Sequence, residues 1–383
     1  MGLAIAVDSA VSIGSSGRSY PSAEKLFPLE NGAPVAIAIF GSAQFIGLPW
    51  KLVIETFIAR LGSQRFETLA EYQQAFLAFC ASNHPLFTAE LEAQEFKATV
   101  SLFWRHQLRP VFAEHGEDAR EWGEEAWDAV RGTLARDADW WTPDLLPGLE
   151  ESLGRDVLEA FAPQVDELRE YWFDGVLPPQ DIWAQYLAMI ERIVVRDVIV
   201  PDLASGIVFL GYGEGEFFPG YSHVSIGSRL LGRVRWRQTD RSVIAPIEKS
   251  GSIQVFAQPD MVDAFILGIP RRMERPLVEQ IEQATRTALQ QAQLAEASSA
   301  AVDVEAAAEA ATGSFFELLH REFRAPLMDA VAGLPTRELA GLSRTLVSLA
   351  AFRSQLALDQ TGSVGGEIRV AVLTKNGGVQ WAA

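Results

Sequence analysis

The stretch GLAIAVDSAVS, residues 2–12, decides how the fold of this chain begins. Its first part is an almost unbroken apolar run, which is typical of a strand with both faces buried. The run ends on Asp8, and an unpaired aspartate is costly to remove from water. We therefore expect Asp8 either to lie at the water-facing rim of a sheet or to be compensated by a cation.

Lys25 is the candidate cation for Asp8. It follows the Gly/Ser-rich turn SIGSSGRS at 12–19 and opens the apolar segment KLFPL at 25–29. A lysine and an aspartate on neighbouring strands lower each other's cost of partial burial. A third apolar run, PVAIAIFG at 34–41, predicts another strand. We expect these three segments to be consecutive strands of one sheet.

Strand-like and helix-like blocks alternate along the rest of the chain. Ser42 is a candidate N-cap for a helix reaching Leu61, and helical patterns then continue to about residue 199. Strand patterns return at 206, a second helical region runs from about 259 to 356, and a hairpin closes the chain. The predicted order is strands, helices, strands, helices, strands.

The first helical region carries eight of the ten tryptophans. Such large side chains need burial, so this region is expected to have a core of its own. The sequence thus predicts a discontinuous body, residues 1–48 and 206–383, with a helical, Trp-rich insertion at 49–205. The acidic stretch at 114–128 is either a docking surface for a basic partner or a solvated helix face.

Composition excludes several classes of function. The 50 acidic and 32 basic residues give a net charge of −18, which repels nucleic acid and anionic membranes. The single cysteine, Cys80, allows no internal disulfide and suits a reducing compartment. No apolar run is long enough for a membrane span, and no basic leader precedes the first strand. We expect a cytoplasmic protein.

Common catalytic patterns fail on their surroundings. Ser22 and Lys25 have the S-x-x-K spacing, but LFPL after Lys25 is extended where that motif needs a helix. Ser222 lacks the final glycine of a nucleophile elbow, and the adjacent His223 points to the opposite face of a strand. The five histidines have no metal-ligand spacing. We expect no cofactor and no metal site.

Four segments in order resemble a known family. They are GLAIAVDSAVS (2–12), AEKLFPL (23–29), PVAIAIFGSAQF (34–45) and VGGEIRVAVLTKNGGVQWA (364–382). Together they resemble the proteasome β-subunit type of N-terminal nucleophile (Ntn) hydrolase, and are most similar to little-characterised bacterial proteasome-like proteins. The resemblance implies an α+β fold, a four-layer αββα sandwich, here with a large helical insertion.

The resemblance also implies roles for single residues. The family's nucleophile is a Thr, Ser or Cys at the mature N-terminus, activated with help from its own α-amine. Asp8 matches the aspartate on the second strand, and Lys25 the lysine that keeps the nucleophile's pKa low. Gly41 matches the glycine whose N–H, at the start of the first long helix, forms the oxyanion hole. Asp359 and Ser363 resemble the family's supporting Asp and Ser, with a spacing that is one residue longer than in the family.

The front of the chain departs from the family pattern. The residues before Asp8 belong to the second strand, so the nucleophile's own strand is missing, and Ser9 is internal and lacks a free amine. Three explanations stay open: a start at an internal methionine of a longer amide or peptide hydrolase, a non-catalytic scaffold or protein-binding relative, and an unrelated hydrolytic or binding function on this fold. We also expect self-association, but not into an ordinary closed proteasome barrel, and a protein or peptide ligand.

Overall fold

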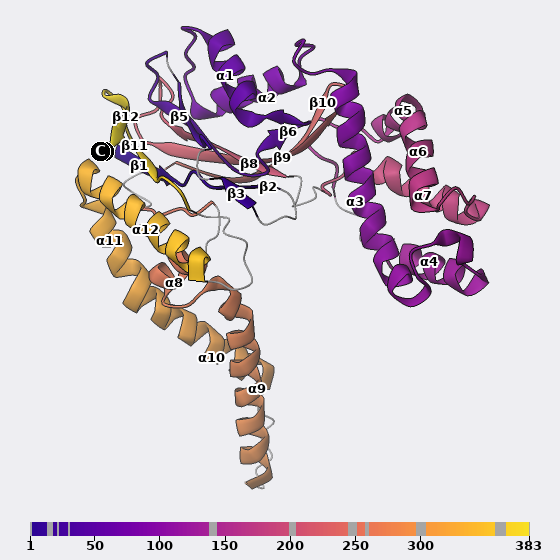
Figure 1. The fold of residues 1–383 in the computed structure, drawn as a ribbon. Helices are drawn as coiled ribbons and strands as arrows, with labels where there is room; N and C mark the ends of the chain where they lie inside the picture. Colours follow the sequence, from indigo (N-terminus) through magenta and orange to yellow (C-terminus); the bar gives the residue numbers. More distant parts are fainter. Residues whose placement is uncertain are drawn as a thin grey trace.

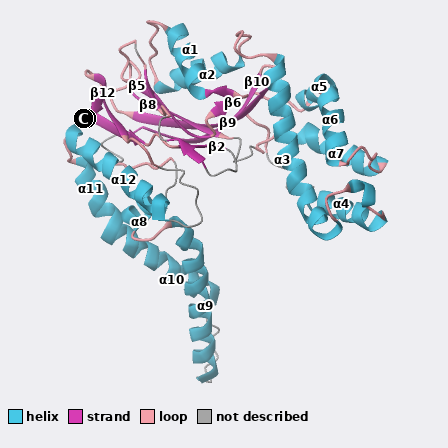
Figure 2. Cartoon of the chain, viewed as in Figure 1, coloured by secondary structure: helices cyan, strands magenta, loops and turns pink. Residues whose placement is uncertain are grey.

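The structure is a computed structural model, and the chain is a mixed α+β protein (Figures 1 and 2). The residues described by the structure are 2–13, 18–20, 23–29, 31–137, 144–198, 204–243, 251–256, 260–295, 304–356 and 365–382.

The larger sheet has five antiparallel strands in the order β10-β9-β8-β5-β4. Its strands are β4 (Leu26–Pro28), β5 (Val35–Gly41), β8 (Ser205–Gly211), β9 (Gly220–Leu230) and β10 (Arg233–Val243). Every residue of β8 is buried, which fits its central place in the order. The strands predicted after residue 206 are present as β8, β9 and β10. The apolar stretch SIQVFA at 252–257, which the same pattern also predicts as a strand, forms no strand over its described residues 252–256.

The second sheet has three antiparallel strands in the order β1-β11-β12. They are β1 (Gly2–Val7), β11 (Arg369–Thr374) and β12 (Gly378–Ala382). The closing hairpin is confirmed, but the expectation of one sheet for the first three apolar runs is wrong. β1 pairs with β11 from the other end of the chain, while β4 and β5 belong to the larger sheet.

The two sheets face each other across an apolar layer. Strand alternation sends Leu3, Ile5 and Val7 of β1 into this layer, where they pack with Ala371 and Leu373 of β11. The larger sheet contributes Leu26, Ala36, Ala38, Val208, Leu210 and Tyr221. Both faces of β1 are covered, because its other face, of glycine and alanine, lies against α12 (Thr336–Leu356). This explains the unbroken apolar run at the start of the chain.

Helices cover the outer faces of both sheets (Figure 1). Helices α1 (Trp50–Leu61) and α2 (Leu69–Ala81) pack on the five-stranded sheet. On the other side α12 contacts β1 and β11, and α8 (Asp260–Leu267) and α11 (Ala325–Ala332) pack against α12. The apolar residues from Leu339 to Leu356 recur at the spacing of an amphipathic helix, and this helix is α12.

The first helix begins later than the sequence predicts. Residues after Gly41 form a small hairpin of β6 (Gln44–Phe45) and β7 (Leu48–Pro49), with positive φ at Ile46 and Gly47. Ser42 is therefore not an N-cap, and α1 starts at Trp50, whose indole N–H donates to Ser205 Oγ at 2.7 Å. Pro49 is the residue before α1, and the bond to Ser205 ties the first residue of this helix to β8.

The helical insertion has a core of its own, but it begins later than residue 49. Trp50 and the apolar faces of α1 and α2 belong to the same cluster as the five-stranded sheet. The predicted boundary thus divides a continuous core. A separate cluster, which includes Trp104, Trp122 and Trp127, runs from Phe96 to Val195 and also contains Leu230 of β9.

The helices with this separate core follow α2 directly. They are α3 (Ala89–His115), η2 (Ala119–Glu121), α4 (Glu124–Asp137), α5 (Ser152–Ala160), α6 (Ala162–Trp172) and α7 (Gln180–Ile193). The pair Pro178-Pro179 predicts a helix start, and α7 begins directly after it, since Pro179 is the residue before this helix.

A helical hairpin projects away from the sheets (Figure 1). It consists of α9 (Arg271–Ala295) and α10 (Val304–Leu319), which contact each other and continue through a π-helical turn, His320–Arg324, into α11. The Ala-rich segment at 290–313 has a low complexity that is compatible with either a helix or a linker. It is helical up to Ala295 and again from Val304. Two short strands, β2 (Val11–Ile13) and β3 (Arg18–Tyr20), pair after Asp8.

Candidate functional site

Asp8 lies where β1 ends, and its carboxylate is fully engaged. Lys25 Nζ donates to Oδ1 at 2.8 Å, and the backbone N–H groups of Ala10 and Gly365 donate to Oδ2 at 3.3 and 3.0 Å. The Asp8 side chain is 14% exposed and that of Lys25 is 16% exposed. Asp8 is therefore both near the rim of a sheet and compensated by a cation, so each of the two alternatives expected from the sequence is met.

The backbone next to Lys25 is fixed by pairing with β5. The N–H of Ile39 donates to the carbonyl of Lys25 at 2.9 Å, one step beyond the Leu26–Ala38 pair of the β4–β5 ladder. Lys25 thus belongs to the edge of the larger sheet, while Asp8 ends a strand of the smaller one. Their ion pair joins the two facing sheets at one end.

Glu24 secures the same segment from the other side. Its carboxylate accepts from Arg369 Nη1 of β11 at 2.7 Å and pairs with Lys51 Nζ of α1 at 3.0 Å. Burial raises the pKa of Glu24, but the hydrogen bonds from Arg369 and Lys51 outweigh it, so its pKa lies below the ordinary value. Glu24 is therefore an anion that ties three elements together beside Lys25.

Gly41 lies at the same end of the two sheets, two residues along β5 from Ile39, the backbone partner of Lys25. Its φ is +78°, and a Cβ there would approach the carbonyl oxygen of Ala204 to 2.7 Å. Only glycine fits this close approach. The expectation that Gly41 stands at a helix start is wrong, because β6 and β7 intervene and α1 begins at Trp50. Its N–H therefore lacks the helix N-terminus expected around an oxyanion hole.

Asp359 and Ser363 lie outside the described residues. Gly365, two positions after Ser363, does reach the site and binds Asp8 through its N–H. Sequence reasoning missed Gly365, Glu24 and Arg369 as parts of the site. The available signals were the glycine pair after Val364, a charge two positions before β4 and another at the first residue of β11.

His223 lies between the sheets and has a packing role. Its ring contacts Phe40 and Phe256, with centroids 5.1 and 5.7 Å away. Burial lowers the pKa of His223, and the nearby Asp240 only partly opposes this. The neighbouring Ser222 faces α2 and donates to Gln73 Oε1, so the rejection of a nucleophile elbow agrees with the contacts.

The arrangement offers one charged pair for chemistry. An ammonium group has three donors, and within the part of the chain that the structure describes Lys25 Nζ donates one hydrogen bond, to Asp8. The remaining N–H bonds can face an anionic or nucleophilic group. Within the described ranges no three His, Cys, Asp or Glu residues lie together as metal ligands, and no helix is long and apolar enough to cross a membrane.

Comparison with known proteins adds no relative: no family model matches the chain, and neither a curated protein nor a solved structure matches it significantly.

Proposed function

We propose that this chain has the Ntn-hydrolase fold of the proteasome β-subunit type and that Asp8 and Lys25 are the charged pair of an amide-hydrolysing site. The Asp8–Lys25 ion pair, closing one end of two facing antiparallel sheets, carries the proposal. The outer helices on both sheets and the strand order support the αββα sandwich that this family implies.

The proposed reaction uses a Thr, Ser or Cys at a mature N-terminus upstream of Gly2. Its hydroxyl or thiol attacks the amide carbon, and its proton passes to the free α-amine. The amine then protonates the departing nitrogen, and water hydrolyses the ester or thioester that remains. Lys25 favours the deprotonated nucleophile through its positive charge, while Asp8 holds the ammonium group in place.

A second candidate is a non-catalytic scaffold or protein-binding member of the same fold. The hairpin β6–β7 between Gly41 and α1 favours it, because it separates the glycine from the helix start that an oxyanion hole would use. In this case the Asp8–Lys25 pair is a strand-to-strand brace without a reacting partner.

The first experiment identifies the N-terminal residue of the protein isolated from its native host, by measuring its intact mass. A mature Thr, Ser or Cys upstream of Gly2 supports the hydrolase, and a terminus at Met1 or Gly2 supports the scaffold. The hydrolase form is then treated with an epoxyketone. We expect Lys25→Ala to abolish labelling and Lys97→Ala, at the exposed Lys97–Glu167 pair, to leave it unchanged. Full labelling of Lys25→Ala would exclude the role of this lysine.

We further propose that the protein self-associates into an assembly other than a closed proteasome barrel. Helices α3–α7 stand beside the sheets and α9–α10 project from the opposite helical layer (Figure 1). Such projections obstruct close stacking of rings. Mass photometry is expected to give an oligomer well below proteasome size, and a particle of proteasome size would refute this.

A further inference from the structure

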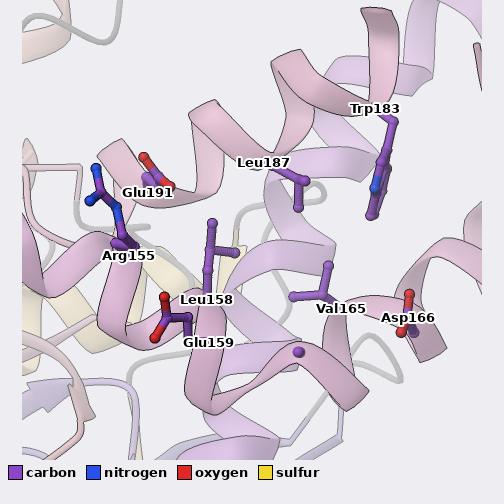
Figure 3. Close-up of a pocket in the computed structure, with 9 residues that line it drawn as sticks. Arg155, Leu158, Glu159, Val165, Asp166, Trp183, Leu187 and Glu191 are labelled. Atoms are coloured by element: carbon purple, nitrogen blue, oxygen red, sulfur yellow. The ribbon is translucent and has the colours of Figure 1, made fainter. Parts of the chain in front are cut away.

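An open groove lies on the helical insertion, away from Asp8 and Lys25. Helices α5, α6 and α7 form it, and its volume is about 370 Å³ (Figure 3). This lies within the roughly 300–1,000 Å³ typical of ligand sites. Its apolar lining residues are Leu158, Ala162, Val165, Trp183 and Leu187, and its charged ones are Arg155, Glu159, Asp166 and Glu191.

The apolar floor arises because α7 has two apolar stripes. One stripe, which includes Ile182, Tyr186 and Ile190, is fully buried in the core of the insertion. The other stripe consists of Trp183 and Leu187, which are four residues apart and only partly buried against that core. Helix α5 likewise has a partly buried residue, Leu158, one position after the buried Val157. Together these side chains form an apolar surface that no other part of the insertion covers completely.

The charged rim is predominantly acidic. Asp166 pairs with Arg169 at 3.2 Å, and the guanidinium of Arg169 stacks over the Trp183 ring at 5.5 Å. Glu159 and Glu191, in contrast, have no ion pair or side-chain hydrogen bond with the described residues. Among the residues that line the groove, Arg155 has the one cationic side chain. A binding partner can therefore gain charge-assisted contacts at both glutamates.

We propose that this groove binds an amphipathic segment of a basic partner protein. The segment places apolar side chains on Leu158, Trp183 and Leu187, and sets Lys or Arg against Glu159 and Glu191, the mode in which a helix lies in a groove. A second copy of the chain fits this groove poorly, because a partner with a net charge of −18 adds negative charge to an acidic rim. The self-association proposed above therefore uses other surfaces. The proposal is independent of the hydrolytic site.

The test is fluorescence anisotropy of the full chain with a labelled peptide of Leu and Lys at helical spacing. A peptide with Glu at every Lys position keeps the apolar stripe and reverses the charge. We expect binding of the Lys peptide at about 150 mM salt and at least about tenfold weaker binding of the Glu peptide. Equal binding of both peptides overturns the proposal.

Matched variants locate the binding site. Glu159→Lys/Glu191→Lys is expected to weaken the Lys peptide at least about tenfold, and Leu187→Gln to weaken it without changing the net charge. The control, Glu114→Lys/Glu117→Lys, has the same charge change outside the groove and is expected to stay within about twofold. Equal losses of peptide binding in the groove variant and in the control would mean that the attraction is non-specific. If the wild type is a dimer and Glu159→Lys/Glu191→Lys dissociates it, a second copy of the chain occupies the groove. Either result refutes the proposal.

Discussion

At the scale of single residues, the site is built from compensated charges. Asp8 accepts from one ammonium and two backbone N–H groups, and Glu24 accepts from two cations beside it. Such half-buried charges are retained at modest cost because each has a partner within hydrogen-bond distance. Removing one member leaves the others unpaired, so the effect of a substitution depends on what remains.

A double-mutant cycle at Asp8→Asn and Lys25→Met measures the worth of this pair. We expect each single change to lower the free energy of unfolding by about 1–3 kcal/mol, with a coupling energy of about 1 kcal/mol or more. Urea unfolding provides the values. The matched cycle at Glu167→Gln and Lys97→Met, an exposed pair, is expected to couple by less than about 0.5 kcal/mol. Equal coupling in the two cycles would contradict a special role for the buried pair.

Glu95 on α3 makes the stability depend on pH. Burial raises its pKa to about 7, although the guanidinium of Arg235 on β10 opposes this. In the unfolded chain the pKa of Glu95 has its ordinary value near 4.5. As the pH rises, the unfolded chain therefore loses this proton before the folded protein does. The contribution of Glu95 to stability is therefore fully present below pH 4.5 and is lost as the pH rises towards 7.

Glu95→Gln removes this pH dependence. Relative to the wild type, the variant is expected to gain stability progressively between pH 4.5 and 7 and to reach a constant advantage of about 1–3 kcal/mol above that. Urea unfolding at several pH values gives this difference. Glu114→Gln, an exposed carboxylate on the same helix, is the control and should leave the profile unchanged. A flat difference for Glu95→Gln would show that its environment is not as described.

At the scale of elements, α3 is attached to the larger sheet by buried charge. Arg229 of β9 pairs with Glu92 of α3, and it also donates to the carbonyls of Cys80 and Ser82 at 3.0 Å each. Arg235 of β10 reaches the carbonyls of Ile193 and Val198. The insertion is thus joined to the strand ends at both its first and its last helix.

Arg229→Met tests this attachment. It leaves Glu92 buried without its cation, so we expect the free energy of unfolding to fall by about 3–5 kcal/mol. Adding Glu92→Met should recover part of this loss, because a buried apolar pair avoids the unpaired charge. Urea unfolding measures both. Arg275→Met, at an exposed pair on α9, should stay within about 0.5 kcal/mol, and a comparably small effect of Arg229→Met would argue against a buried attachment.

At the scale of the whole molecule, the chain forms apolar clusters that meet at β9. The cluster under α1 and α2 contains Cys80, which is fully buried, and Leu230 of β9 belongs to the cluster of the insertion. Burial raises the pKa of the Cys80 thiol well above its ordinary value. A reagent can therefore reach this thiol only when the apolar cluster under α1 and α2 opens.

Cys80 reports this opening directly. Ellman's reagent is expected to leave the native protein unmodified and to titrate one thiol in denaturant, because only the exposed thiolate reacts. Arg229→Met should speed labelling, since Arg229 binds the Cys80 carbonyl. The control is Cys80→Ala/Ser63→Cys, which places the thiol on an exposed loop and should react at once. Rapid labelling of the native wild type would contradict the burial of Cys80.

The sequence by itself determined the order of strands and helices, the closing hairpin, the starts of α7 and β8, and the pairing of Asp8 with Lys25. These follow from local periodicity, proline placement and the cost of an uncompensated charge. Only the tertiary structure decided which sheet each strand joins, where α1 begins and that Gly365 binds Asp8, 357 residues away in sequence. Periodicity tells which face of an element is buried, whereas the partner that covers the face is chosen by packing of the whole chain.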